Sequence, residues 1–189
     1  NSATLFVPQG IGADLIATMS GFSRHDVDAF AVESQKRATA ARAAGYFDGS
    51  VVPVKDKLGQ VILAQDEFIK PSTTVETLGG LKASFEQLGA MGFDAVALQR
   101  YPQVERIAHV HTAGNAPCMA DGAAALLLGS TRAVRDSGLQ ARARILACAD
   151  ACVPMVQTGA VQATQRALKL AGLQTQDIEL WEVRDSFAA

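Results

Sequence analysis

The sequence has few cysteines, no excess of basic residues and no long apolar run. Its three cysteines are an odd number and do not suggest a disulfide framework, so a reducing cytoplasm is the expected location. A formal net charge of −2, with no block of lysine or arginine, argues against a nucleic acid partner. No run approaches the roughly 20 apolar residues that span a bilayer, and residues 1–6 lack the features of a signal peptide.

What is present indicates a folded chain. Hydrophobic residues make up 49% of the 189 residues and charged residues 19%, which supports a buried core and argues against disorder. The length suits one ordinary domain or two small ones. Much of the apolar content is alanine, which favours helices and close packing but buries little area per residue. We therefore expect a thin core.

The first half predicts helices around a small β element. Ser23 and Asp26 fit a capping box that opens a helix, which an apolar stripe continues and Gly45 ends. The other expected elements are a helix over 11–19, short strands over 51–54 and 61–64, and short helices over 75–78 and 81–85.

The second half predicts an α/β arrangement. Three apolar runs, 124–128, 145–149 and 178–183, are typical of buried strands. Helices are expected over 131–137, closed by Gly138, and over 159–171. Alternation of strand and helix implies neighbouring strands in a mostly parallel sheet with covering helices.

Two candidate cofactor sites have weak support. Gly10 and Gly12 open a helix, but Leu15 stands where a dinucleotide-binding motif has its third glycine. His109 and His111 would share one face of a strand and could hold a metal with Cys118 and Asp121, although the spacing matches no known zinc class. We therefore predict no metal and no cofactor.

Two further patterns concern nucleophiles. Cys148 and Cys152 are more simply interpreted as small buried thiols. A Ser-His-Asp arrangement stays open on composition alone, but no Gly-x-Ser-x-Gly elbow supports an ordinary hydrolase.

Five segments in order carry a more specific signal. They are 22–31 with Ser34-Gln35, 66–69 with 81–85, 112–116 with 121–125, 162–168, and 182–189. Their sequences resemble the thiolase family's “SRxxxDxFAxxSQ”, “DExxR…LxxLxPxF”, “TAGNASGxxDGAAA”, “PxPAxxKAL” and “ExNEAFAA” motifs. The matches extend across the whole chain, so the chain resembles the thiolase family of acyl-CoA acyltransferases.

The resemblance implies an α/β thiolase-like fold, with duplicated βαβαβ halves and an inserted loop domain, incomplete in this chain. Residues 1–111 would be the loop domain, with an extended insert at 86–111. Residues 112–142 would end the first half, and 143–189 would begin the second.

The resemblance also implies an activity and its limits. Thiolases transfer acyl groups of acetyl-CoA and 3-ketoacyl-CoA thioesters, in fatty acid metabolism among other settings, and usually form dimers or tetramers. Their catalytic cysteine, Gly-His-Pro and Cys-x-Gly segments do not occur here. We therefore expect the middle of a thiolase, inactive alone, that works with the remaining segments or as a homo-oligomer. The alternative is a non-catalytic thiolase-like subunit that binds acyl-CoA or a partner protein.

Five residues take roles from matching motif positions. Lys82 falls where a basic residue lies near the adenine-phosphate end of coenzyme A, and Thr164 matches a serine-like contact to pantetheine. Phe187 and Ala188 would flank the thioester. Arg184 stands where the family has an asparagine that helps to stabilise an oxyanion, and arginine is longer, planar and permanently charged.

Overall fold

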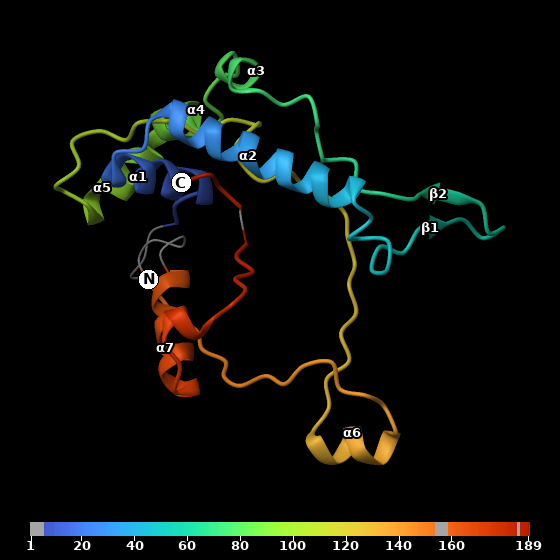
Figure 1. Cartoon of the computed structure of the whole chain (residues 1–189). Helices are drawn as coiled ribbons and strands as arrows, with labels where there is room; N and C mark the ends of the chain where they lie inside the picture. The colour runs from blue at the N-terminus through green and yellow to red at the C-terminus, as the bar shows by residue number, and fades with distance from the viewer. Residues whose placement is uncertain (1–5, 154–158, 185) are drawn as a thin grey trace. The chain divides into compact units, whose positions relative to one another are not determined.

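The computed structural model describes residues 6–153, 159–184 and 186–189 (Figure 1). The chain divides into two compact units. Unit 1 is Asn1–Cys118 with Asp185–Ala189, and unit 2 is Met119–Arg184.

Unit 1 is built on two helices, both predicted from the sequence. Helix α1 spans Gln9–Ser20 and α2 spans Arg24–Ala43. The capping box at the start of α2 is confirmed: the Asp26 N–H donates to Ser23 Oγ at 3.2 Å, and the Ser23 N–H donates to Asp26 Oδ2 at 2.8 Å. Gly45, with φ of 74°, follows the last turn of α2 in the left-handed conformation that favours glycine.

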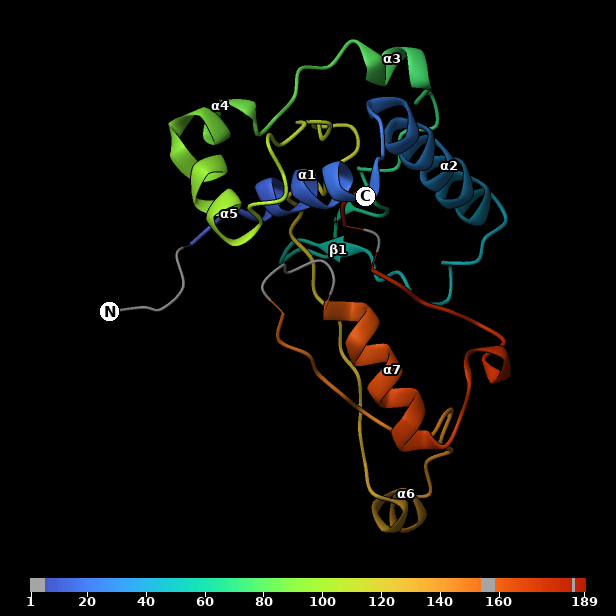
Figure 2. The ribbon, with the colours of Figure 1, turned by 90° about the vertical axis from the view of Figure 1, so that its left-hand side faces the viewer.

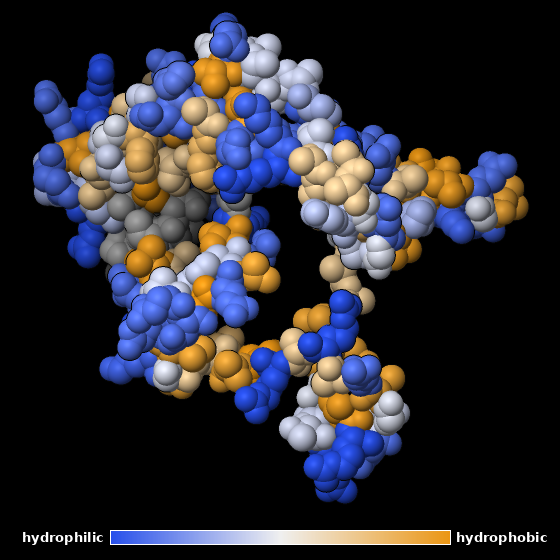
Figure 3. All heavy atoms as spheres, in the orientation of Figure 1, coloured by the Kyte–Doolittle hydropathy of each residue, from blue (hydrophilic) through white to orange (hydrophobic). Residues whose placement is uncertain are grey.

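A small antiparallel hairpin forms from β1 (Val54–Lys55) and β2 (Val61–Leu63). The predicted strand over 61–64 is confirmed apart from its last residue, but the one over 51–54 is wrong for residues 51–53, because β1 begins only at Val54. The turn is held by Asp56 Oδ1, which accepts from the N–H groups of Leu58 and Gln60. Both strands are exposed, and Figure 3 shows apolar side chains on the surface of this hairpin.

Four short helical segments follow: α3 (Val75–Gly79), α4 (Glu86–Leu88), a π-helical turn η1 (Gly89–Phe93) and α5 (Asp94–Arg100). Figure 2 shows α4 and α5 close to α1. The predicted helix over 75–78 is confirmed, but the one over 81–85 is wrong. The Ser84 N–H donates to the His111 carbonyl at 2.9 Å, so this segment pairs with distant backbone instead of coiling.

Unit 2 contains two of the predicted helices. Helix α6 spans Thr131–Ser137, and Ser130 Oγ caps it by accepting from the Ala133 N–H at 3.1 Å. Gly138 closes it with φ of 67°, as expected. Helix α7 spans Gly159–Ala171, and a 3₁₀ turn, η3, spans Thr175–Asp177.

The prediction that 124–128, 145–149 and 178–183 are neighbouring strands is wrong for this structure. All three runs are irregular, and within the described residues the only paired strands are β1 and β2. Their side chains are not buried: Leu126 is 83% exposed and Leu180 89%. A strand needs a neighbour to pair its N–H and C=O groups, and the described chain offers these runs none. Composition alone could not show that these runs lack a pairing neighbour.

The core of unit 1 is small and made largely of short side chains, as the alanine content predicts. One cluster joins Ala17, Val27 and Val110, with Ala188 and Ala189 packed against it. A second joins Ala31, Val32 and Leu78, with Val75 against it. Among the described residues, no helix has the length and apolar character needed to cross a membrane.

Candidate functional site

A buried carboxylate organises the centre of unit 1. Asp14, on α1, is fully buried. Its Oδ1 accepts from the N–H groups of Val110 and His111 at 3.1 and 3.0 Å, and lies 2.7 Å from His111 Nδ1. Burying an ionised carboxylate is costly unless donors surround it, and here the segment before Thr112 supplies them. Asp14 therefore fixes the path of that segment.

His109 lies between two carboxylates. Its Nδ1 is 2.8 Å from Asp14 Oδ2, and its Nε2 is 3.0 Å from Asp94 Oδ2 at the start of α5. Burial, the largest single influence, lowers the pKa of His109, but the hydrogen bonds and charges of Asp14 and Asp94 together outweigh it. The pKa is raised above the ordinary 6.5. The two carboxylates therefore stabilise the charged form of His109 by more than burial disfavours it.

A second buried pair crosses from α2 to the Thr112–Asn115 turn. Asn115 Nδ2 donates to Asp28 Oδ1 at 2.7 Å, and Asn115 Oδ1 accepts from the Thr112 N–H at 2.7 Å. Arg24 Nε donates to the other oxygen of Asp28 at 2.7 Å. Arg24 also donates to the Leu78 carbonyl. These bonds hold the turn rigidly against α2.

The C-terminal residues of unit 1 lie on this polar centre. The Ala188 N–H donates to the Asn115 carbonyl at 3.2 Å. The Phe187 ring packs edge-to-face with His111, with centroids 5.3 Å apart, and tilts against Phe85 at 6.0 Å. Phe187 is therefore oriented by a histidine that Asp14 in turn holds.

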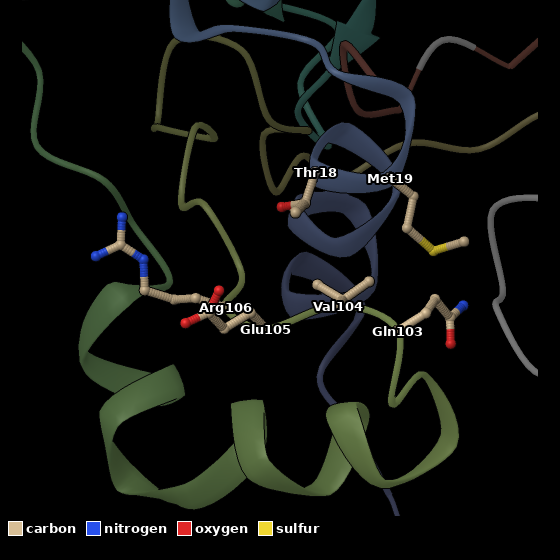
Figure 4. Close-up of a pocket in the computed structure, with 6 residues that line it drawn as sticks. All are labelled: Thr18, Met19, Gln103, Val104, Glu105 and Arg106. Carbon is tan, nitrogen blue, oxygen red and sulfur yellow. The ribbon is translucent and has the colours of Figure 1, made fainter.

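An apolar cavity of about 300 Å³ borders Phe187. It is lined by Phe22, Asp26, Phe30, Phe187, Ala188 and Ala189. A second cavity of about 500 Å³ lies between the end of α1 and the loop after α5 (Figure 4). Its lining is mixed in character and comes from Thr18, Met19, Gln103, Val104, Glu105 and Arg106. Only the first cavity includes predicted site residues.

The structure brings some predicted residues together and not others. Phe187 and Ala188 both line the 300 Å³ cavity and contact the Thr112–Asn115 turn or its neighbour. Lys82, also in unit 1, is exposed. Thr164 is half-buried on α7 of unit 2, and Arg184 is exposed in that unit.

The histidine pair and Gly10 serve the packing of unit 1, whereas nothing lies within 4 Å of the Cβ position of Gly12. His109 and His111 bind Asp14, while Cys118 and Asp121 are exposed; the described residues contain no cluster of three or more groups that could hold a metal. Gly10 lies inside α1, where a Cβ would come within 2.3 Å of the Phe85 ring, so its lack of a side chain makes room for that ring.

The interpretation of Cys148 and Cys152 as buried thiols is wrong. Both are exposed, because the apolar run before them has no cover in the described chain.

Sequence reasoning missed the role of Asp14. A signal was present: Asp14 stands among Ile11, Ala13, Leu15 and Ala17, the buried apolar residues of α1. An acid in such surroundings needs a buried partner, and the histidine pair at 109 and 111 offers one. Because Asp14 is more than 90 residues from His109 and His111 in the sequence, local patterns could not indicate that they pair.

Comparisons with known proteins show which family the sequence matches. The thiolase N-terminal domain family matches residues 3–95. A 3-ketoacyl-CoA thiolase of Aliivibrio fischeri is 35% identical over 185 residues, covering 95% of this chain and 43% of that protein. An acetyl-CoA acetyltransferase of Escherichia coli is 38% identical over 184 residues, covering 95% and 42%.

Solved structures give the same result. Human mitochondrial 3-ketoacyl-CoA thiolase matches with a TM-score of 0.77 and 32% identity, covering 96% of this chain and 41% of that one. Bacillus anthracis acetyl-CoA acetyltransferase matches with a TM-score of 0.79 and 28% identity, covering 96% and 42%. The fold is therefore thiolase-like, and the chain spans less than half the length of these relatives.

The fold and the sequence matches together define the class, and the chain belongs to the thiolase family.

Gly114, in the Thr112–Asn115 turn, offers a test of the packing beneath the site. A Cβ there would lie 2.3 Å from Leu78 Cδ2 and 3.0 Å from Leu81 Cδ1. Because Leu78 is buried, we expect Gly114→Ala to lower the free energy of unfolding by about 1–3 kcal/mol. Urea titration measures the loss. Gly12→Ala is the matched control, since nothing lies within 4 Å of its Cβ position; an equal loss in both variants would contradict the packing shown.

Proposed function

We propose that this chain is part of a thiolase, an acyl-CoA C-acyltransferase that acts on acetyl-CoA or 3-ketoacyl-CoA thioesters, and that Phe187 and Ala188 flank the bound thioester. The observation that carries the proposal is the packing of Phe187 on His111 and the bond from Ala188 to Asn115, beside an apolar cavity. The names of the relatives, 3-ketoacyl-CoA thiolase and acetyl-CoA acetyltransferase, supply the substrate class.

The chemistry of the cavity suits one part of such a substrate. Phe22, Phe30 and Phe187 present aromatic surface, and Asp26 is the one ionisable residue of the lining. An acyl thioester and its pantetheine arm are mostly uncharged, and apolar walls exclude water from them. The transferred acyl group moves between a cysteine thiolate and coenzyme A, and we propose that groups outside these 189 residues supply the thiolate and the acid and base.

We propose that two other residues contact the rest of the coenzyme. By position in the family motifs, Lys82 would approach the adenine-phosphate end, and Thr164 the pantetheine. The exposure of Lys82 leaves its ammonium group free to meet a phosphate. No further cofactor is proposed.

The protein's partners and location follow from the same proposal. The exposed apolar runs 124–128 and 145–149 would be covered by remaining thiolase segments or by another subunit of a dimer or tetramer, since large apolar patches rarely stay bare. We also propose that the protein is cytoplasmic and acts in fatty acid metabolism.

One observation favours a second function. Arg184 replaces the asparagine of the family's “NEAFA” motif, and its side chain is exposed. A permanently charged guanidinium only donates hydrogen bonds, whereas an asparagine amide also accepts them, so arginine cannot reproduce all contacts of the amide. A non-catalytic thiolase-like subunit that binds acyl-CoA or a partner protein would tolerate this change.

Activity separates the two functions. We expect the native protein that contains this sequence to cleave acetoacetyl-CoA with coenzyme A, and the 189-residue chain alone to give no turnover, because it lacks nucleophile, acid and base. Thiolysis is measured by loss of the 3-ketoacyl thioester, and intact mass identifies the native polypeptide. Acyl-CoA binding without turnover by the native protein would favour the non-catalytic subunit. Turnover by the chain alone that Cys118→Ala abolishes would contradict the account.

A further inference from the structure

The cluster around His109 has a property that the proposed acyl transfer does not use. A neutral imidazole has one N–H donor and one nitrogen lone pair, whereas a carboxylate can only accept. Both ring nitrogens of His109 face carboxylate oxygens, at 2.8 Å from Asp14 and 3.0 Å from Asp94. Only the protonated ring satisfies both contacts. The geometry of the cluster therefore requires that both ring nitrogens of His109 carry a proton, and a rise in solution pH can remove one of them.

We propose that protonated His109 is a bridge that holds α5 on α1, and that α5 is released when His109 loses its proton.

The two ends of this bridge differ in strength. The Asp14 side chain is fully buried and also binds the Val110 and His111 N–H groups and the His111 ring. The Asp94 side chain is 24% exposed, and its Oδ1 is buried without a hydrogen-bond partner in the described structure, so this carboxylate gains contacts when it turns to water. A neutral His109 keeps its remaining N–H for the buried Asp14, because an unsatisfied buried carboxylate costs more than one that can turn to water. The contact to Asp94 is therefore lost first.

Little packing holds the segment that carries Asp94. Helix α5 has seven residues, and Ala97 is the one buried residue in it. The turn before it contains Gly92 at φ of 109°, a break in the helical path where the backbone can pivot. Gly89 makes room for the bridge, since a Cβ there would lie 2.6 Å from the Asp94 carboxylate. Release of α5 need not disturb α1.

The direction of the pH effect follows from linkage. Burial lowers the pKa of His109, and the two carboxylates raise it by more, so the folded value exceeds 6.5. A group whose folded pKa is raised contributes stability that is complete below the unfolded value and lost as pH rises through the folded value. The charged and titratable groups of this cluster are Asp14 of α1, Asp94 of α5, and His111 on the other oxygen of Asp14. Release is therefore expected on the alkaline side.

Hydrogen exchange of the native protein, read by mass spectrometry and corrected for the intrinsic rate, tests the bridge. From about pH 6 to about pH 9, we expect peptides over 94–100 to exchange at least about tenfold faster, while peptides over 9–20 stay protected. Asp94→Asn should remove this pH dependence, because an amide can donate to a neutral ring nitrogen and accept from a charged ring. His109→Gln, which has no titrating group, should also give a flat profile.

Glu33→Gln is the matched control, since it removes the carboxylate of an exposed ion pair with Arg37 on α2. It should keep the wild-type profile. A flat profile in the wild type, or a rise that persists in both Asp94→Asn and His109→Gln, would overturn the proposal.

Discussion

Asp14→Ala is expected to lower the free energy of unfolding by about 3–5 kcal/mol, the range for removing one partner of a buried charged network. The variant leaves the Val110 and His111 N–H groups and two imidazole rings without their shared acceptor in a site closed to water. Each stranded donor costs about 1–3 kcal/mol, and relaxation recovers part of the sum. Urea titration of the native protein, followed by circular dichroism, measures the loss.

Asp26→Ala is the control for this loss. It removes the same side chain from the exposed capping box of α2, where water replaces the lost contacts. Its effect should be a small fraction of the effect of Asp14→Ala. Equal losses in the two variants would mean that Asp14 does not organise the centre of unit 1.

Arg184→Asn should raise thiolase turnover in the native protein. If Phe187 flanks the thioester, residue 184 lies three positions earlier on the chain, and a guanidinium carried into the closed site must be desolvated. An asparagine restores the family's amide without that cost. The turnover number with acetoacetyl-CoA is the measurement, and Arg184→Lys, which keeps the charge, is the control that should give no rise.

The opposite result has a definite meaning. A tenfold fall in Arg184→Asn, about 1.4 kcal/mol of barrier, would make Arg184 a working oxyanion donor. The departure from “NEAFA” would then mark altered chemistry, and the non-catalytic function would be ruled out.

Local signals predicted the local structure well. The Ser23–Asp26 capping box and the left-handed glycines at 45 and 138 each depend on residues within a few positions of one another. Their geometry can therefore be predicted from the sequence. The site residues Phe187 and Ala188 came instead from the resemblance, and the structure places them on the Thr112–Asn115 side of unit 1.

Long-range features were not predictable in the same way. The 124–128 run has the composition of a buried strand, but whether it pairs depends on a neighbour that composition does not reveal. The links from Asp14 to His109 and from Asp28 to Asn115 join residues more than 80 positions apart. Each partner alone is an ordinary polar residue; only packing shows that they meet.

The most direct test of the central claim is a crystal structure of the native protein with an acyl-CoA bound. The account predicts that the thioester lies against Phe187 and Ala188, with Phe187 still packed on His111 and the Ala188 N–H still bonded to the Asn115 carbonyl. An acyl-CoA whose thioester lies away from Phe187 and Ala188 would contradict it.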